Sequence, residues 1–292
     1  MPIDGKALAE HILEKLRGEI VELKQQGLTP TLAVIQVGDD PASGAYIRQK
    51  KMAAEQIGAV LHLCHVSSIT RQEELQKIIR KYNNDTGVHG IILQRPLPAP
   101  LSTQTMALCR LIDPTKDIDG FLPNSPYSVP VASAVIAILG EVHHLTGLNP
   151  VMYRVQPLQN NFTHWLHQQR IVILGRGDTA GKPIAEMLIK RGCLVTVVHS
   201  KTPNPDEGMK TADILVSCVG KSNVVRRDNI KKGVILISVG IHRDQSGKLH
   251  GDYREEEIQD TATCFTPTPG GVGPVNVACL MANLLAATKS PL

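Results

Sequence analysis

The sequence has few aromatic residues: phenylalanine, tyrosine and tryptophan make up 3% of its 292 residues. Proteins that hold single-stranded nucleic acid use aromatic side chains on which bases stack, so this scarcity argues against such a surface. The excess of positive charge is also small, at +4, and it is dispersed along the chain. We therefore expect no nucleic-acid partner.

The chain also lacks paired cysteines and long apolar runs. Its six cysteines form no C-x-x-C motif, and such isolated cysteines are typical of core positions in a reducing compartment. The longest uncharged stretch, residues 121–140, is interrupted by prolines and serines, and its apolar half is too short to cross a bilayer. No signal-peptide core precedes the first amphipathic segment. We therefore expect a cytoplasmic protein with no membrane partner.

Apolar segments with strand and helix periodicity alternate along the chain and indicate an α/β fold. Strands are predicted at 32–37, 59–66, 90–93, 171–174, 194–198, 214–217 and 234–238, and the main helices at 8–23, 41–57, 71–82, 130–144 and 274–287. This alternation predicts mostly parallel sheets that are covered on both faces. The amide-rich segment 145–169 has weak periodicity and is interpreted as an interdomain segment with one short helix near 162–167.

The length of the chain suits two domains. We place the first over residues 1–125 and the second over residues 126–273. The last helix, within residues 274–292, is apolar enough to return to the first domain.

Residues 171–183 have the pattern of a nucleotide-binding turn. An apolar strand leads into a turn that contains Gly175, Gly177 and Gly181, and helical periodicity follows. This arrangement presents free backbone N–H groups to a phosphate, although its spacing is one residue longer than G-x-G-x-x-G. Read alone, the pattern leaves open a plain glycine-rich turn without a ligand.

The following strand indicates which nucleotide binds. An NAD site usually places an acidic residue at the end of this strand to hold the ribose hydroxyls. Here the strand ends in Ser200 and Lys201, and Arg176 lies on the preceding turn. A hydroxyl and two cations favour a 2′-phosphate, so the predicted cofactor is NADP.

Candidate catalytic residues lie in the first half of the chain. Tyr46 and Lys50 are four residues apart on the helix that Asp40 and Pro41 begin, so their side chains share one face. Lys51, five residues after Tyr46, points elsewhere and is interpreted as a solvated lysine. The pattern alone leaves the same interpretation open for Lys50.

Polar residues also follow the strand at 90–93 and lie in a nearby loop. Gln94 comes directly after that strand and is either a substrate ligand or an exposed amide. Asp117 and Asp119 are either ligand groups or satisfied loop carboxylates. No further acidic or histidine cluster completes a metal site, so no metal is expected.

Residues 266–274 form an unusual loop with three glycines and three prolines in nine residues. Such a stiff segment has close backbone approach at its glycines and ends at a helix N-terminus. The sequence shows no evident folding purpose for it, so a ligand-facing loop is favoured over the alternative of a plain turn.

In their order along the chain, these segments resemble the bifunctional methylenetetrahydrofolate dehydrogenase/methenyltetrahydrofolate cyclohydrolase (FolD) family. The resemblance rests on residues 41–50, 90–98, 116–121, 175–183, 199–202, 239–241, 251–252 and 269–274. It implies an N-terminal folate-binding catalytic domain and a Rossmann-type NADP domain with a cleft between them. It also implies oxidation of methylenetetrahydrofolate with NADP, hydrolysis of the product to 10-formyltetrahydrofolate, and a homodimer formed through the nucleotide domains.

The same resemblance assigns roles to individual residues. Lys50 would be the essential acid–base group, Gln94 would support it, and Asp119 would bind the pterin. Tyr46 would flank the folate, whose pocket would be lined by Pro269, Gly270, Gly271 and Pro274. The cofactor would contact Gly175, Arg176, Gly177, Ser200 and Ile241, to which the charge argument adds Lys201.

Some positions depart from the family pattern. Gly177 stands where the family usually has serine, which removes one hydroxyl near the predicted phosphate, and residues 145–169 resemble an insertion. Two alternatives therefore stay open: another NADP-linked dehydrogenase of the shikimate or amino-acid type that shares only the Rossmann half, and a non-catalytic relative that binds folate or nucleotide.

Overall fold

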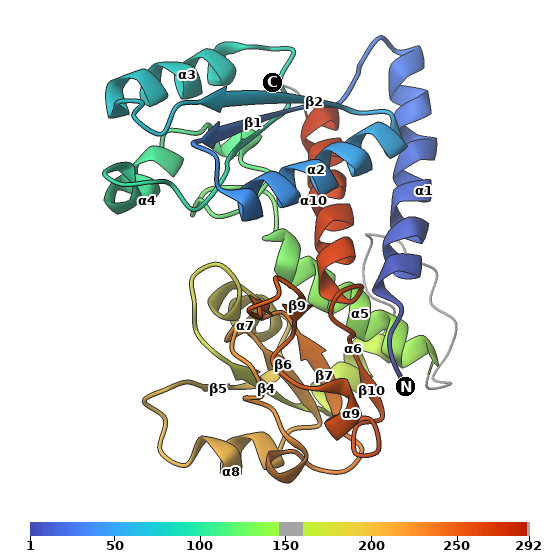
Figure 1. The fold of residues 1–292 in the computed structure, drawn as a ribbon. Helices are drawn as coiled ribbons and strands as arrows, with labels where there is room; N and C mark the ends of the chain where they lie inside the picture. Colours follow the sequence, from blue (N-terminus) through green and yellow to red (C-terminus); the bar gives the residue numbers. More distant parts are fainter. Residues whose placement is uncertain (146–159, 291–292) are drawn as a thin grey trace. The chain divides into compact units, whose positions relative to one another are not determined.

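The computed structural model describes residues 1–145 and 160–290 (Figure 1). Its residues form two compact units, each with its own parallel sheet. We call Glu10–Pro130 with Val277–Leu292 the N-terminal unit, and Met1–Ala9 with Val131–Asn276 the nucleotide-type unit. These sheets confirm the predicted α/β fold class.

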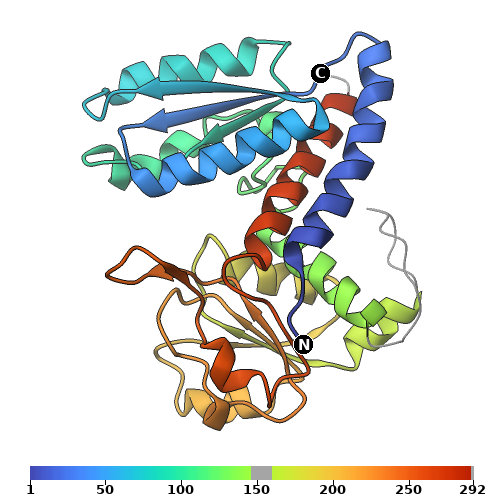
Figure 2. The same ribbon diagram turned by 45° about the vertical axis from the view of Figure 1, so that its right-hand side comes forward.

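The N-terminal unit is built on a parallel sheet with the strand order β2-β1-β3. Its strands are β1 (Thr31–Val37), β2 (Val60–Val66) and β3 (Gly90–Leu93). Crossover helices α2 (Pro41–Ile57) and α3 (Gln72–Asn84) lie on opposite faces of this sheet (Figures 1 and 2). That arrangement is expected because the two right-handed crossovers run in opposite directions along the sheet. Strand β1 is buried along its whole length, since it is the central strand.

Shorter elements and the last helix complete this unit. They are η1 (Leu101–Gln104), α4 (Thr105–Cys109), η2 (Pro114–Lys116) and the long helices α1 (Gly5–Gln25) and α10 (Val272–Lys289), whose ends extend into the other unit. The Asn283 amide on α10 donates hydrogen bonds to the carbonyls of Ile118 and Ser128, both at 2.8 Å. Among the described residues, α10 is the one helix long and apolar enough to span a membrane, but 61% of it is buried, as in a core helix.

The nucleotide-type unit has a parallel sheet with the order β10-β7-β6-β4-β5. Its strands are β4 (Arg170–Leu174), β5 (Leu194–Val198), β6 (Ile214–Ser217), β7 (Ile235–Ser238) and β10 (Cys264–Phe265). The helical elements are α5 (Pro130–Leu145), α6 (Asn160–His167), α7 (Gly181–Lys190), α8 (Pro205–Lys210), η3 (Arg227–Asn229) and α9 (Glu255–Ile258). Strands β8 (His242–Arg243) and β9 (Leu249–His250) form a separate antiparallel hairpin.

The first residues of the chain pack in the nucleotide-type unit, although the sequence interpretation counted them with the N-terminal domain. The backbone N–H of Ile3 donates to the carbonyl of Phe265 at 2.8 Å, and the N–H of Phe265 donates to the carbonyl of Met1 at 3.0 Å. These residues extend the sheet beside β10 through backbone groups. Because the pairing is non-local, side-chain periodicity could not predict it.

The predicted main strands and long helices are present, with ends shifted by a few residues. The short helix predicted near 162–167 is present as α6. Most of the predicted interdomain segment, residues 146–159, lies outside the described residues. The sequence interpretation missed α4, α8, α9, β10 and the β8–β9 hairpin, because elements of two to six residues carry little periodic signal.

Candidate active site

Helix α2 positions the first group of candidate residues. The Asp40 carboxylate accepts a hydrogen bond from the Ser43 N–H at 2.7 Å, and Pro41 is the first helical residue, so the start of the helix is well defined. Lys51 lies on the exposed side, where its ammonium is 3.9 Å from the Glu55 carboxylate and 60% of its side chain is exposed. The prediction that Lys51 is a solvated lysine is confirmed.

Lys50 meets the end of strand β3. Its Nζ donates a hydrogen bond to Gln94 Oε1 at 3.0 Å. Gln94 is only 9% exposed, and its own N–H donates to the Ile35 carbonyl as if it continued the strand. The amide Nε2 of Gln94 donates to the carbonyl of Arg95 at 3.0 Å, which fixes the orientation of the side chain. The structure therefore excludes the exposed loop amide that the sequence left open for Gln94.

The surroundings of Lys50 shift its protonation. Burial lowers the pKa of the Lys50 ammonium below its ordinary value, since a charged group loses its hydration there. The Asp119 carboxylate opposes this shift, and the Arg95 guanidinium adds to it. Such a lysine has a larger neutral fraction near physiological pH than a solvated one, which suits proton transfer.

The two carboxylates of the 116–120 loop have different surroundings. Asp117 is buried and accepts a hydrogen bond from the Leu122 N–H at 2.8 Å, while burial raises its pKa. Asp117 is thus the satisfied loop carboxylate that the sequence allowed. Asp119 is only partly buried and is the carboxylate that acts on Lys50. Gly120 has a φ of +68°, and a Cβ there would lie 2.6 Å from the Tyr127 carbonyl oxygen, so the turn requires glycine.

A pocket beside β3 contains Asp119 and a cation that the sequence interpretation did not single out. Arg95 places its guanidinium carbon 4.2 Å from the centre of the Phe121 ring, a cation–π distance. Other lining residues are Ile91, Ile92, Leu93, Met106, Cys109, Ile112, Asp117 and Leu122. The family motif leaves the residue between Gln94 and Pro96 unspecified, so it did not point to Arg95. The one signal in the sequence that could have identified Arg95 is its position just after the end of strand β3.

The turn after β4 requires its glycines. Gly175 has a φ of +104°, and its N–H donates to the Val198 carbonyl at 2.8 Å. A Cβ on Gly181 would lie 2.2 Å from the Gly175 carbonyl oxygen, so the start of α7 packs directly on the turn. Arg176 and Gly177 are at least partly exposed, and a Cβ on Gly177 would meet no atom within 4 Å. The turn therefore leaves open space at Gly177 for a ligand.

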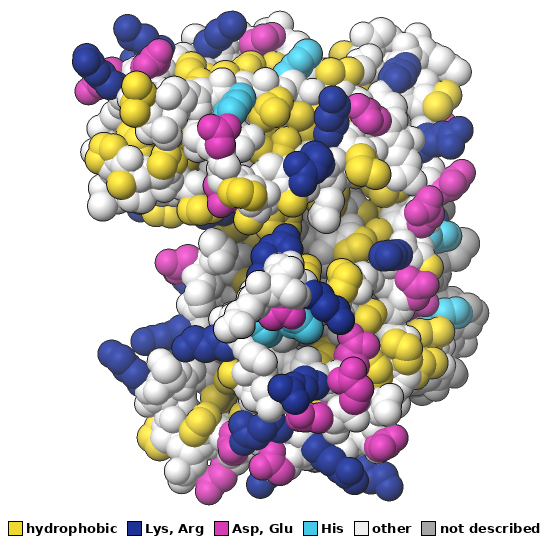
Figure 3. All heavy atoms as spheres, in the orientation of Figure 1, with side chains coloured by type: hydrophobic (Ala, Val, Ile, Leu, Met, Phe, Trp, Pro, Cys, Tyr) yellow, Lys and Arg dark blue, Asp and Glu magenta, His cyan; other side chains and the backbone are white. Residues whose placement is uncertain are grey.

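The loop after β5 is ordered by its own hydrogen bonds. The His199 N–H donates to Thr202 Oγ1 at 3.0 Å, and the Lys201 N–H donates to His199 Nδ1 at 3.1 Å. Ser200 and Lys201 are exposed at its tip, and Ile241, after β7, is 37% exposed. Figure 3 shows Lys and Arg side chains gathered near the loops that follow β4 and β5. Arg176 and Lys201 thus supply accessible cations on these loops, and the exposed Asp178 carboxylate on the first loop lies 4.0 Å from the Lys182 ammonium.

The glycine- and proline-rich loop packs tightly within the nucleotide-type unit. A Cβ on Gly271 would lie 2.6 Å from the Pro267 carbonyl oxygen, and one on Gly5 would lie 2.0 Å from the Gly271 carbonyl oxygen. Two glycines of the chain are thus explained by backbone packing at this loop. The predicted role of Pro269, Gly270, Gly271 and Pro274 with Lys50, Gln94 and Asp119, which belong to the other unit, stays a prediction, as does the cleft between the units.

No group of three or more His, Cys, Asp or Glu side chains within residues 1–145 and 160–290 is arranged to hold a metal ion.

Two family models match the chain in succession. Residues 3–119 match the model of the tetrahydrofolate dehydrogenase/cyclohydrolase catalytic domain, and residues 153–291 match that of the NAD(P)-binding domain of the same family. The bifunctional protein FolD of Bacillus pumilus is 40% identical over 99% of this chain and 98% of its own length.

Solved structures of FolD enzymes are similar in fold to nearly the whole of this chain. The bifunctional FolD enzyme of Campylobacter jejuni has a TM-score of 0.88 at 33% identity, covering 99% of this chain and 98% of that one. The FolD enzyme of Trypanosoma brucei, solved with NADP cofactor and inhibitor, has a TM-score of 0.86 at 32% identity, covering 99% and 97%.

Proposed function

Because the chain belongs to the tetrahydrofolate dehydrogenase/cyclohydrolase family, we infer that it catalyses two successive steps of folate one-carbon metabolism. The first step oxidises methylenetetrahydrofolate to the methenyl cation with NADP⁺. The second step hydrolyses that cation to 10-formyltetrahydrofolate. A match to the catalytic domain over residues 3–119 rules out a dehydrogenase that shares only the Rossmann half.

The residues of the turn after β4 fit a dinucleotide phosphate. A Cβ on Gly181 would not fit, the positive φ of Gly175 favours glycine, and the space beside Gly177 is open. Arg176, Ser200 and Lys201, which are accessible on these loops, would hold the 2′-phosphate. When bound, NADP⁺ accepts the hydride of the methylene bridge, and the contribution of the protein to that step is alignment in a desolvated site.

The hydrolysis requires proton transfer, for which Lys50 is the proposed group. Water adds to the methenyl carbon as one of its two protons passes to a base. The bond from that carbon to N5 then breaks as N5 takes up a proton, and the remaining hydroxyl proton is released to solvent as the formyl C=O forms on N10. A neutral Lys50 amine can accept the first proton, and the resulting ammonium can supply the second. Gln94, 3.0 Å from Lys50 Nζ, orients the amine, and this contact is the observation that carries the assignment.

The remaining predicted substrate residues support the same proposal. Tyr46 lies one helical turn before Lys50 on α2, where its ring would flank the folate. Asp119 would accept hydrogen bonds from the pterin, with Pro269, Gly270, Gly271 and Pro274 lining the rest of the pocket. Asp119→Ala should therefore raise the KM for methylenetetrahydrofolate without changing the affinity for NADP.

The test of the activity is direct. Purified protein is mixed with methylenetetrahydrofolate and NADP⁺, and the absorbance of the methenyl product is followed as it forms and decays. We expect NADPH formation followed by loss of the methenyl signal. No NADPH formation would refute the dehydrogenase assignment, and a methenyl signal that decays no faster than without protein would refute the cyclohydrolase assignment.

The assembly and location of the protein also belong to this proposal. The resemblance to the family favours a homodimer through the nucleotide-type unit in the cytoplasm, with folate and NADP as its small-molecule partners. Sedimentation at micromolar concentration tests the dimer, and a monomer throughout would contradict it. Fractionation of the source cells tests the location.

A further inference from the structure

One buried carboxylate of the nucleotide-type unit has no part in the chemistry above. Asp252 follows the β8–β9 hairpin and is 0% exposed. Its Oδ2 accepts hydrogen bonds from Ser217 Oγ at 2.5 Å and from the Val219 N–H at 2.9 Å, and its Oδ1 accepts one from the Lys221 N–H at 2.9 Å. All three donors are neutral and belong to one short segment at the end of β6. The two oxygens of a carboxylate can accept such a set of donors, whereas a buried amide would turn a donor toward one of them.

The backbone of Asp252 is joined to the neighbouring strand end as well. Its N–H donates to Ser238 Oγ at 3.0 Å, and Ser238 Oγ donates to the Gly240 carbonyl at 3.1 Å. A Cβ on Gly240 would lie 2.2 Å from Asp252 Oδ2 and 2.4 Å from the Gly220 nitrogen. Asp252 thus holds together the segments that leave β6 and β7. The second segment continues from Gly240 into Ile241, one of the predicted cofactor contacts.

These segments lie at the edge of the sheet where the nucleotide is proposed to bind. Strands β4, β6 and β7 are parallel, so their carboxyl ends share one edge. A Cβ on Gly175 would lie 3.0 Å from the Cys218 carbonyl oxygen, so the segment that Asp252 holds touches the phosphate-binding turn. Ligands of open α/β sheets bind at this edge.

We propose that Asp252 is a positioning residue for the nucleotide, because it holds residues 217–221 and 240–241 in the arrangement that contacts NADP. This inference rests on the proposed function. Loops that are already ordered before binding lose less conformational entropy when the ligand arrives, so the contribution of Asp252 is measured in nucleotide affinity.

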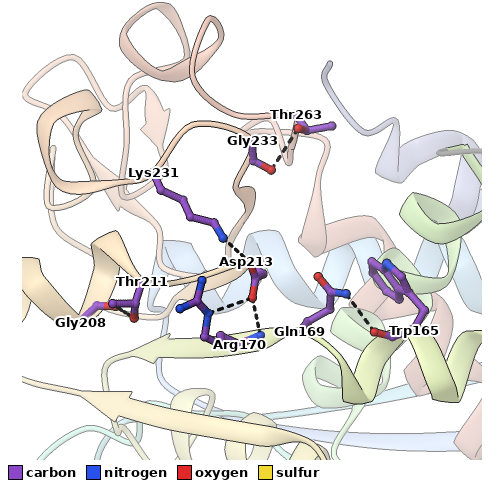
Figure 4. A network of polar contacts seen from close by, with 9 residues as sticks. All are labelled: Trp165, Gln169, Arg170, Gly208, Thr211, Asp213, Lys231, Gly233 and Thr263. Carbon is purple, nitrogen blue, oxygen red and sulfur yellow. Dashed lines mark hydrogen bonds and ion pairs between the residues drawn. The ribbon is translucent and has the colours of Figure 1, made fainter.

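Asp213 provides a matched control at the other end of the same strand. It directly precedes β6 and accepts hydrogen bonds from the Arg170 N–H at 2.7 Å, from Arg170 Nε at 3.3 Å and from Lys231 (Figure 4). Like Asp252, it is a carboxylate that joins segments of the sheet through several donors. It lies at the amino end of the strand, where no nucleotide contact is proposed.

The experiment compares NADPH affinity in the wild type, Asp252→Asn, Ser217→Ala and Asp213→Asn. Direct titration of the purified proteins by nucleotide fluorescence requires no turnover, and circular dichroism checks the fold. Asp252→Asn should raise the Kd for NADPH by about tenfold or more, since all three hydrogen bonds to the side chain lose their charged acceptor. Ser217→Ala, which removes one donor and keeps the carboxylate, should raise the Kd severalfold. Asp213→Asn should leave it within about twofold of the wild type, as expected for a site distant from the change.

The KM for methylenetetrahydrofolate separates positioning from a general loss of structure. It should stay unchanged in Asp252→Asn and Ser217→Ala. An unchanged Kd for NADPH in either folded variant would overturn the inference, and so would an equal loss of affinity in Asp213→Asn. If Asp252→Asn does not fold, Ser217→Ala decides alone. A wild type that binds no NADPH would refute the proposed function and this inference together, whereas a wild type and variants that bind it equally would refute the inference only.

Discussion

Replacing Lys50 with methionine tests the proposed cyclohydrolase mechanism most directly. Methionine keeps the apolar stem of the side chain but cannot transfer a proton. General acid–base catalysis contributes about 10²–10⁴-fold to rates, which corresponds to about 2.7–5.4 kcal/mol in activation free energy. Because Lys50 Nζ is the hydrogen-bonding neighbour of Gln94 Oε1, and Lys51 faces solvent, no adjacent amine is placed to substitute. We therefore expect kcat for hydrolysis to fall by about 10²-fold or more.

The assay must separate this chemical loss from a loss of stability. Lys50→Met removes the ammonium that donates to the buried Gln94 Oε1 and leaves that oxygen without its partner. This loss should lower the free energy of unfolding by about 1–3 kcal/mol, which a denaturant titration would measure. Lys51→Met is the control: its exposed 3.9 Å ion pair with Glu55 is worth about 0.3–0.5 kcal/mol, and its rate should match the wild type. The decay of the methenyl absorbance is followed for the wild type, Lys50→Met and Lys51→Met at equal concentrations of folded protein. Equal rates for the two variants, or a greater loss with Lys51→Met, would refute the assignment of Lys50.

Three further predictions follow from the charges. The Arg95 guanidinium helps to lower the pKa of Lys50, so Arg95→Met should raise that pKa. In a plot of the hydrolysis rate against pH, the rise that reports deprotonation of Lys50 should then move to higher pH. A rise at the same pH as in the wild type would contradict this. Arg176→Ala should lower the preference for NADP⁺ over NAD⁺ in kcat/KM by about tenfold or more, because a charge-assisted hydrogen bond is worth about 1.5–3 kcal/mol. Equal kcat/KM for both nucleotides in the wild type would contradict the predicted preference. The hydroxyl missing at Gly177 would then be the first explanation to test. Burial raises the pKa of Asp213, but hydrogen bonds and charge from Lys231 and Arg170 outweigh burial and lower it below 3.8. The folded protein thus binds fewer protons there than the unfolded chain, so this stabilisation is full above pH 3.8 and is lost as pH falls through the lower, folded pKa. Denaturant titrations should show Asp213→Asn less stable than the wild type at neutral pH, with the gap closing in acid; a gap independent of pH would contradict this.

Local signals in the sequence were enough to predict the elements that carry the site. The Asp40–Pro41 cap predicted where α2 begins, because capping depends on neighbouring residues only. The strand and glycine turn around Gly175 were predicted for the same reason. NADP was indicated by Arg176, Ser200 and Lys201 together with the lack of an acidic residue at the end of the next strand. Family motifs, which record chemistry rather than contacts, named Lys50, Gln94 and Asp119.

The tertiary structure decided which of these groups meet. The hydrogen bond from Lys50 to Gln94 joins residues 44 apart in sequence, and it exists because β3 pairs beside β1 while α2 packs on the sheet that they share. The contact of Asp252 with Ser217 spans 35 residues, and Arg95 reaches Phe121 only through the folding of the loop after β3. Periodicity reports which face of an element is buried, but not the partner against which it is buried. The burial that lowers the pKa of Lys50, and the buried carboxylate that holds the strand ends, therefore arise only when distant segments of the chain pack together.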